Sequence, residues 1–148
     1  MLQIQIATPA DAEIIAKCTR DAYQKEIHDF DDPNKTNTYP PTEEVQTHIS
    51  QHTYYKFVVD NEIIGGVFIV KKDEQTHSIE NFCIAPTHHG KGYGTFILRE
   101  IERLNPDVKI WVLNTPTYSV KNQYIYEKHG YQRLDMYQRE DGMMLYNY

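Results

Sequence analysis

The sequence has little cysteine, little positive charge and no long hydrophobic segment, and each shortage excludes a class of protein. Only 2 Cys occur in 148 residues, too few for a disulfide framework, so a reducing compartment is expected. The balance of 15 Lys+Arg against 21 Asp+Glu gives a net charge of −6, whereas a general nucleic-acid binder needs a basic surface. The longest apolar segment, Ile63–Val70, is far shorter than the about 20 residues of a membrane helix. The sequence therefore predicts a cytoplasmic globular protein with no nucleic-acid or membrane partner, and Met1–Ile4 show no signal-peptide pattern.

Linkers and internal repeats are also missing, which indicates a single domain over residues 1–148. The nearest candidate for a boundary is residues 29–41, DFDDPNKTNTYPP, which is polar and rich in turn formers. We interpret it as a loop within that domain. The one conspicuous excess is tyrosine, with 12 residues that are concentrated toward the C-terminus.

Hydrophobic periodicity predicts alternating strands and helices along the chain. Strands are expected at Leu2–Ile6, Tyr54–Val59, Ile63–Val70, Thr76–Ala85, Val108–Leu113, Tyr131–Tyr137 and Met143–Tyr148. Helices are expected at Pro9–Ile27, at Thr42–Gln51, after Gly94, and from a Ser119 cap to His129, where Gly130 ends the helix. This order predicts an α/β fold with a mixed central sheet of about six to seven strands, flanked by about four helices.

Three alternate glycines, Gly90, Gly92 and Gly94, stand where the strand Thr76–Ala85 gives way to a helix. Glycines let the backbone approach a ligand closely, and the free N–H groups at a helix start favour an anion. A pyrophosphate is the natural occupant of such a loop.

Two common phosphate loops do not fit this segment. A Walker loop needs Ser or Thr after its lysine, but Lys91 is followed by Gly92. A dinucleotide-binding fingerprint needs glycine where Thr95 stands, and an acidic residue at the end of the next strand, where there is none. A tight turn without a ligand is the remaining alternative.

The loop and a downstream segment together resemble the GNAT acetyltransferase superfamily. Residues His89–Gly94 match its motif Gln/Arg-x-x-Gly-x-Gly/Ala, with His89 in place of the usual Gln or Arg. Residues Asn122–Tyr131 look like its segment Asn-x-x-x-Tyr-Glu-Lys-x-Gly-Phe/Tyr. The resemblance covers essentially the whole chain and implies the GNAT fold, in which two parallel strands splay to form the acyl-CoA cleft. Here they would be Thr76–Ala85 and Val108–Leu113.

The resemblance implies acetyl-CoA as co-substrate and no metal. The backbone of Phe82, Cys83 and Ile84 would pair with the pantetheine arm, and a strand N–H would polarise the thioester carbonyl. The other expected cofactor contacts are His89, Gly90, Lys91, Gly92, Tyr93, Gly94, Thr95 and Asn122. His48 and His52 have a spacing that metal sites use, but no motif accompanies them, and we interpret them as surface histidines.

Two residues are candidates for the chemical step. Tyr126 aligns with the family tyrosine that protonates the leaving thiolate, and the alternative is a core aromatic residue. Glu80 is the candidate base, and period two places it on one strand face with Phe82 and Ile84. The alternatives for Glu80 are a solvent-facing position or an ion pair, with water accepting the proton instead.

The 29–41 loop lies where the family builds its acceptor pocket. Phe30, Asp31, Asp32 and Tyr39 would receive a cationic amine by charge and cation–π contact, and an exposed, solvated loop is the alternative. The resemblance implies an N-acetyltransferase that moves the acetyl group to a small-molecule or peptide amine by direct attack in a ternary complex. The alternative is a non-catalytic acyl-CoA-binding, sensor or interaction domain. A homodimer through the tyrosine-rich C-terminal strands is also possible.

Overall fold

The computed structural model describes residues 1–30, 40–117, 119–140 and 144–148. They fold into two compact units. The N-terminal unit comprises Met1–Val70 and Glu80–Tyr93, and the C-terminal unit comprises Lys71–Ile79 and Gly94–Tyr148. No described helix is long and apolar enough to cross a membrane.

The N-terminal unit is built from antiparallel strands and two helices. Its elements are β1 (Leu2–Ile6), a 3-10 turn (Pro9–Asp11), α1 (Ala12–Phe30), α2 (Thr42–Gln51), β2 (Thr53–Val59), most of β3 (Glu62–Lys71) and the second half of β4 (Thr76–Ile84). β1 pairs with β2, and β2 pairs with β3, both antiparallel. The turn between β2 and β3 has positive φ at Asp60 (51°) and Asn61 (65°), the conformation of a tight hairpin turn. The strands expected at Tyr54–Val59 and Ile63–Val70 are thus confirmed, and they form this hairpin.

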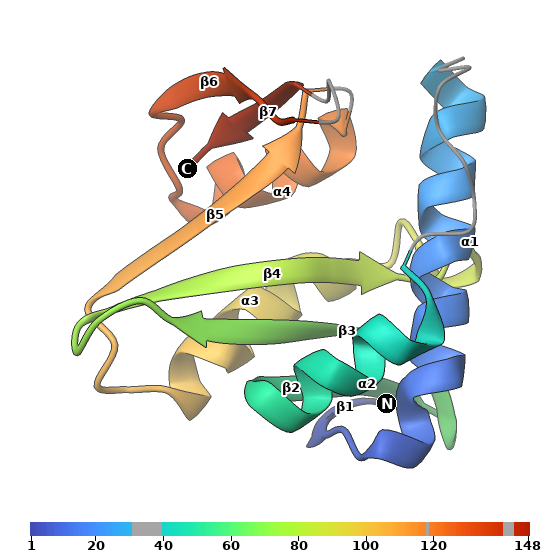
Figure 1. The fold of residues 1–148 in the computed structure, drawn as a ribbon. Coiled ribbons are helices and arrows are strands. Elements are labelled where there is room, and N and C mark those ends of the chain that lie inside the picture. The colour runs from blue at the N-terminus through green and yellow to red at the C-terminus, as the bar shows by residue number, and fades with distance from the viewer. Residues whose placement is uncertain (31–39, 118, 141–143) are drawn as a thin grey trace. The chain divides into compact units, whose positions relative to one another are not determined.

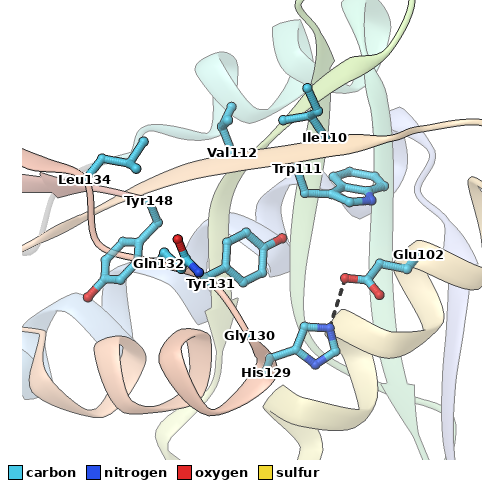
Figure 2. Close-up of a pocket in the computed structure, with 10 residues that line it drawn as sticks. All are labelled: Glu102, Ile110, Trp111, Val112, His129, Gly130, Tyr131, Gln132, Leu134 and Tyr148. Atoms are coloured by element: carbon cyan, nitrogen blue, oxygen red, sulfur yellow. Dashed lines mark hydrogen bonds and ion pairs between the residues drawn. The ribbon is translucent and has the colours of Figure 1, made fainter.

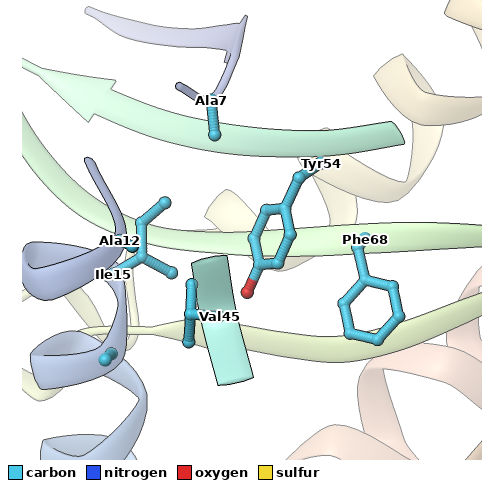
Figure 3. Packing of buried hydrophobic residues seen from close by; sticks show 7 residues of the cluster. Ala7, Ala12, Ile15, Val45, Tyr54 and Phe68 are labelled. Carbon is cyan, nitrogen blue, oxygen red and sulfur yellow. The ribbon is translucent and has the colours of Figure 1, made fainter. Parts of the chain in front are cut away.

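Apolar side chains from both helices pack against the strands in this unit. Ala12 and Ile15 of α1, Val45 of α2, and Tyr54 and Phe68 of the sheet belong to one buried cluster (Figure 3). Ala12 and Ile15 are three residues apart, the spacing that puts side chains on one helix face. The amphipathic patterns of the sequence thus define the core of the N-terminal unit.

The C-terminal unit contains the remaining elements. They are α3 (Tyr93–Leu104, whose first residue belongs to the other unit), β5 (Ile110–Pro116), α4 (Val120–His129), β6 (Asp135–Gln138) and β7 (Met144–Asn147). Residues 76–79 of β4 pair in parallel with residues 110–113 of β5. The next residues of β5, 114–116, pair antiparallel with β7, which also pairs with β6.

The seven described strands are hydrogen-bonded in the order β1-β2-β3-β4-β5-β7-β6 (Figure 1). Together with four described α-helices and one parallel pair, β4–β5, they form an α/β fold with a mixed sheet. This architecture confirms the predicted fold class.

The end of one strand and the start of another differ from the sequence-based expectation. β5 continues to Pro116 instead of ending at Leu113, because its last residues pair with β7. The strand expected at Tyr131–Tyr137 begins only at Asp135. Long-range pairing fixes these ends, and local hydrophobic patterns do not record it.

Candidate functional site

The glycine loop begins where β4 ends, and two hydrogen bonds fix its start. The N–H of Ala85 donates to the carbonyl of Ile64, at 2.6 Å. Nε2 of His89 lies 2.6 Å from the carbonyl oxygen of Ile84, and it must be the donor because a carbonyl only accepts. Between them lies a 3-10 turn, Pro86–His88. The His89 ring therefore binds the loop to the strand that precedes it.

The next residues present backbone rather than side chains. Gly90 and Gly92 have φ of +76° and +79°, a left-handed conformation that favours glycine. Both are exposed, and a Cβ added at either would meet no atom within 4 Å. Tyr93 then begins the 12-residue helix α3, and its ring stacks on that of His88 with centroids 6.3 Å apart. An open left-handed loop at a helix N-terminus can offer N–H groups to an anion.

Gly94 has a packing role in addition to its place in the loop. A Cβ at this position would lie 2.9 Å from Cδ1 of Ile125 in α4. The third glycine thus lets α3 and α4 approach each other closely.

The strand that leads into the loop holds its residues in different environments. Cys83 is buried, and its Sγ lies 3.9 Å and 3.8 Å from the carbonyl oxygens of Cys18 and Thr19 in α1. Its side chain is therefore occupied by packing, which leaves only its backbone for a ligand. The Phe82 ring lies 5.9 Å from that of Phe57.

Asn81 interrupts the regular pleat of β4 between the two candidate residues Glu80 and Phe82. Its φ is +50°, in the left-handed region, which asparagine adopts more readily than most residues. Such a residue locally breaks the alternation of strand faces. The alternation of period two predicted that Glu80 and Phe82 lie on one strand face. Because the left-handed Asn81 between them breaks the alternation, this prediction no longer follows.

Tyr126 lies on α4 and is 3% exposed. Its ring meets the rings of Tyr131 and Tyr148 edge-on, with centroids 6.0 Å away in both cases. Asn122 lies one turn earlier on α4 and is half-buried. The helix thus places Asn122 and Tyr126 at the i, i+4 spacing that the resemblance required.

Sequence reasoning missed Gln123, the buried neighbour of Asn122. Its Nε2 donates to the carbonyl oxygens of Pro116 and Thr117, at 3.1 Å and 3.0 Å. These two bonds fasten the end of β5 to the first turn of α4. No local pattern signals them, because glutamine is common on exposed helix faces.

A polar network on the same helix was also missed. The hydroxyl of Tyr148 donates to Oε2 of Glu127 at 2.6 Å, and Nη2 of Arg133 donates to the same oxygen at 3.0 Å. The Tyr148 hydrogen bond, supported by Arg133, lowers the pKa of Glu127 below its ordinary value. The Arg133 guanidinium also stacks 3.9 Å above the ring centroid of Tyr146.

The expected acceptor residues cannot be placed. Asp31, Asp32 and Tyr39 lie outside the described residues, and Phe30 ends α1 without a described side chain.

His48 and His52 stack on Phe68, with centroids 4.2 Å and 5.4 Å apart. No group of three or more His, Cys, Asp or Glu suited to a metal occurs in the described ranges.

The fold and the loop define an α/β protein whose glycine loop, at a helix N-terminus, is suited to an anion. Residues 50–133, more than half of the chain, match the family model for the acetyltransferase (GNAT) domain. The chain therefore belongs to the GNAT acetyltransferase family. The comparison with curated proteins gives no match.

Solved structures of the family share this fold. An acetyltransferase of the GNAT family from Streptococcus agalactiae matches with a TM-score of 0.80 and 16% identity, over 99% of this chain and 94% of that chain. The PaiA N-acetyltransferase of Thermoplasma acidophilum, in complex with coenzyme A, matches with a TM-score of 0.80 and 14% identity, over 99% and 98%. The aminoglycoside acetyltransferase AAC(6')-Ib, in complex with coenzyme A, matches with a TM-score of 0.72 and 18% identity, over 99% and 93%.

Proposed function

We propose that residues 1–148 form one GNAT domain that transfers an acetyl group from acetyl-CoA to an amine, by direct attack in a ternary complex. The observation that carries this proposal is the glycine loop. Gly90 and Gly92 are left-handed, exposed and free of steric obstruction, and they precede the N-terminus of α3. That combination fits the pyrophosphate of acetyl-CoA. Two of the related structures are of proteins in complex with coenzyme A.

Some of the residues that would hold acetyl-CoA use their backbone, and others use their side chain. Residues 90–95 offer backbone N–H groups to the pyrophosphate, with His89 positioning the loop through its bond to Ile84. The backbone of residues 82–84 pairs with the pantetheine arm. A strand N–H near Asn81 polarises the thioester carbonyl, and the interrupted pleat there supports this because a bulge frees backbone groups from the ladder. Asn122 binds a cofactor amide.

The chemical step forms one bond and breaks another. The amine nitrogen attacks the thioester carbonyl carbon, so the C–N bond forms and the C–S bond breaks. The sulfur leaves as a thiolate and takes the proton of the Tyr126 hydroxyl, which regains a proton from solvent. The ammonium loses one proton to Glu80 or to water before it attacks, and the nitrogen releases a second proton to water after the C–N bond has formed. Asp31, Asp32, Phe30 and Tyr39 receive the amine, which is a cation before it loses its proton.

A comparison of two tyrosines on α4 tests the enzyme. Tyr126 is 3% exposed, whereas Tyr124, two residues earlier, is 66% exposed. We expect Tyr126→Phe to lower kcat about 100-fold while the Kd for CoA stays within twofold, because the hydroxyl serves the leaving group only. Tyr124→Phe should leave both unchanged. Free thiol release is measured over amines, polyamines, amino acids, aminoglycosides and peptide N-termini.

A second comparison tests the glycine loop. Gly92→Val and Gly130→Val both place a side chain at a left-handed glycine with open space around it, but only Gly92 lies in the loop. Gly92→Val should raise the Kd for CoA at least tenfold, and Gly130→Val should not. Absence of CoA binding to the unaltered protein would contradict the proposal outright. CoA binding without thiol release to any acceptor would instead favour the non-catalytic alternative.

A further inference from the structure

A pocket of about 340 Å³ lies in the C-terminal unit, against one side of β5 and beside the last turns of α3 and α4 (Figure 2). Its aromatic walls come from Trp111, Tyr131 and Tyr148. Glu102 of α3 and His129 of α4 line its other side. Neither the expected site residues nor the proposed reaction uses this pocket.

The pocket is distinct from the proposed acetyl-CoA contacts in the same unit. Gly94 and Glu102 are eight residues apart on α3, which is about 12 Å along a helix. Asn122 and His129 are seven residues apart on α4, or about 10 Å. The proposed contacts lie at the first turns of both helices, and the pocket lies at their last turns.

Glu102 supplies the carboxylate of the pocket. Among its described lining residues there is one carboxylate, Glu102, and no Lys or Arg. Nε2 of His129 lies 2.9 Å from Oε1 of Glu102 and donates to it, since a carboxylate only accepts. The Glu102 side chain is 41% exposed, so its other oxygen stays accessible. This accessible carboxylate oxygen attracts a cation.

The aromatic walls favour the same kind of ligand. Ring faces attract a cation, and they do so more strongly when water is partly excluded. The rings of His77 and Trp111 meet at a near-right angle, with centroids 5.7 Å apart, which holds the indole in place. Tyr131 extends along the pocket, with its hydroxyl directed toward the side of Trp111 and Glu102 (Figure 2).

The hydroxyl of Tyr131 supplies a second observation. It is buried and has no hydrogen-bond partner within the described part of the chain. Burial, with a further contribution from the Glu102 carboxylate, raises the pKa of Tyr131, so the phenol stays protonated. A neutral phenol adds no charge to the pocket, so it does not compete with the Glu102 carboxylate for a cation.

We propose that this pocket binds a small organic cation, an ammonium group on an apolar body, between the aromatic rings and the Glu102 carboxylate. The ammonium contacts the accessible oxygen of Glu102, and the apolar body lies against Trp111. Binding here requires no acetyl transfer and no glycine loop.

The fluorescence of Trp111 tests this directly, because it is the one Trp of the sequence. Benzylammonium and its neutral analogue benzyl alcohol are titrated into the protein. We expect a saturable change of emission with benzylammonium, and about five- to tenfold weaker binding of benzyl alcohol. Equal affinities for the two probes, or no saturable change with benzylammonium, would overturn the proposal without any variant.

Two variants of α3 test whether the Glu102 carboxylate is the group that binds the cation. Glu102→Gln should weaken benzylammonium binding about five- to tenfold. Glu100→Gln removes the same charge from a residue that pairs with Arg103 at 2.9 Å and does not line the pocket, so it should change the affinity less than twofold. Equal weakening by both variants would mean general attraction to an acidic protein, and would refute a site at Glu102. Circular dichroism confirms that both variants are folded before they are compared.

Discussion

The N-terminal unit and the α4–β7 region of the C-terminal unit are stabilised by different kinds of contact. In the N-terminal unit, Ile15, Phe57 and Ile64 are almost completely buried, and aliphatic and aromatic side chains fill the space between helices and strands. In the C-terminal unit, the region from α4 to β7 depends more on ring edges around Tyr126 and on hydrogen bonds that meet at Glu127.

This difference decides how each region responds to substitution. Apolar packing is non-directional, so removing a buried methyl group costs transfer free energy and leaves a cavity. A hydrogen-bonded network is directional, and its cost depends on whether a polar atom is left without a partner. The predictions below compare matched residues that separate the two kinds of contact.

The largest effect is expected at a glycine of the N-terminal unit. A Cβ at Gly65 would overlap the backbone oxygen of Cys83, and neither strand can yield without breaking its pairing. At Gly94 of the C-terminal unit the obstacle is the tip of the Ile125 side chain, which can rotate away. We expect Gly65→Ala to lower the free energy of unfolding by more than about 4 kcal/mol, and Gly94→Ala by about 1 kcal/mol. Urea denaturation measures both, and similar losses would contradict the distinction.

The second-largest effect is expected from a comparison of a buried residue of α1 with an exposed one. Ile15 is 0% exposed, and its neighbour Ile14 is 49% exposed. Ile15→Ala should cost about 2–4 kcal/mol because the cavity cannot collapse fully, whereas Ile14→Ala should cost about 0.5 kcal/mol or less. Thermal unfolding of the two variants gives the comparison, and a large loss with Ile14→Ala would show that its surface is covered.

The N-terminal unit was largely predictable from the sequence for the same reason. The helix expected at Pro9–Ile27 and the strands expected at Tyr54–Val59 and Ile63–Val70 rest on local hydrophobic periodicity, and the structure has a helix and two strands at these places. The end of β5 at Pro116 was not predictable, because strand pairing with β7 determines it.

The candidate site also has parts that the sequence predicted and parts that it did not. The glycine loop and Tyr126 were recognisable because they lie in short motifs whose residues are close in sequence. The left-handed Asn81 and the contacts of Gln123 were missed, since each depends on a backbone or side-chain partner that no local pattern specifies. The acceptor residues Asp31 and Asp32 stay predictions.

Two tyrosines beside Tyr126 test the polar contacts of the C-terminal unit. The Tyr148 hydroxyl bonds to Glu127 at 2.6 Å, whereas the buried Tyr131 hydroxyl has no partner among the described residues. Tyr148→Phe should therefore destabilise the protein by about 1 kcal/mol, and Tyr131→Phe should be neutral or stabilising by up to about 1 kcal/mol. Urea unfolding of both variants decides this, and a clear loss with Tyr131→Phe would mean that its hydroxyl has a partner.

The smallest effect concerns a charged pair in the N-terminal unit. Nζ of Lys56 in β2 lies 2.9 Å from Oδ2 of Asp11, which also accepts the N–H of Thr8 at 2.8 Å. Burial acts to raise the pKa of Asp11, but the hydrogen bonds from Thr8 and Lys56 outweigh it, so the pKa is lower than usual. The folded protein thus favours the carboxylate. This contribution is complete above the unfolded pKa of about 4 and is lost as the pH falls through the lower folded value.

Asp11→Asn keeps an oxygen acceptor for Thr8 but removes the charge. It should cost about 1 kcal/mol or less at pH 7, and it should flatten the fall of stability below about pH 4. Asp60→Asn, which removes the same charge from an exposed turn, is the control. The stability of both variants is measured as the urea denaturation midpoint between about pH 2 and 7, the range in which carboxyl groups titrate. If Asp11→Asn kept the acid dependence of the unaltered protein, the pair with Lys56 would contribute nothing, and the N-terminal unit would depend on apolar packing at this place too.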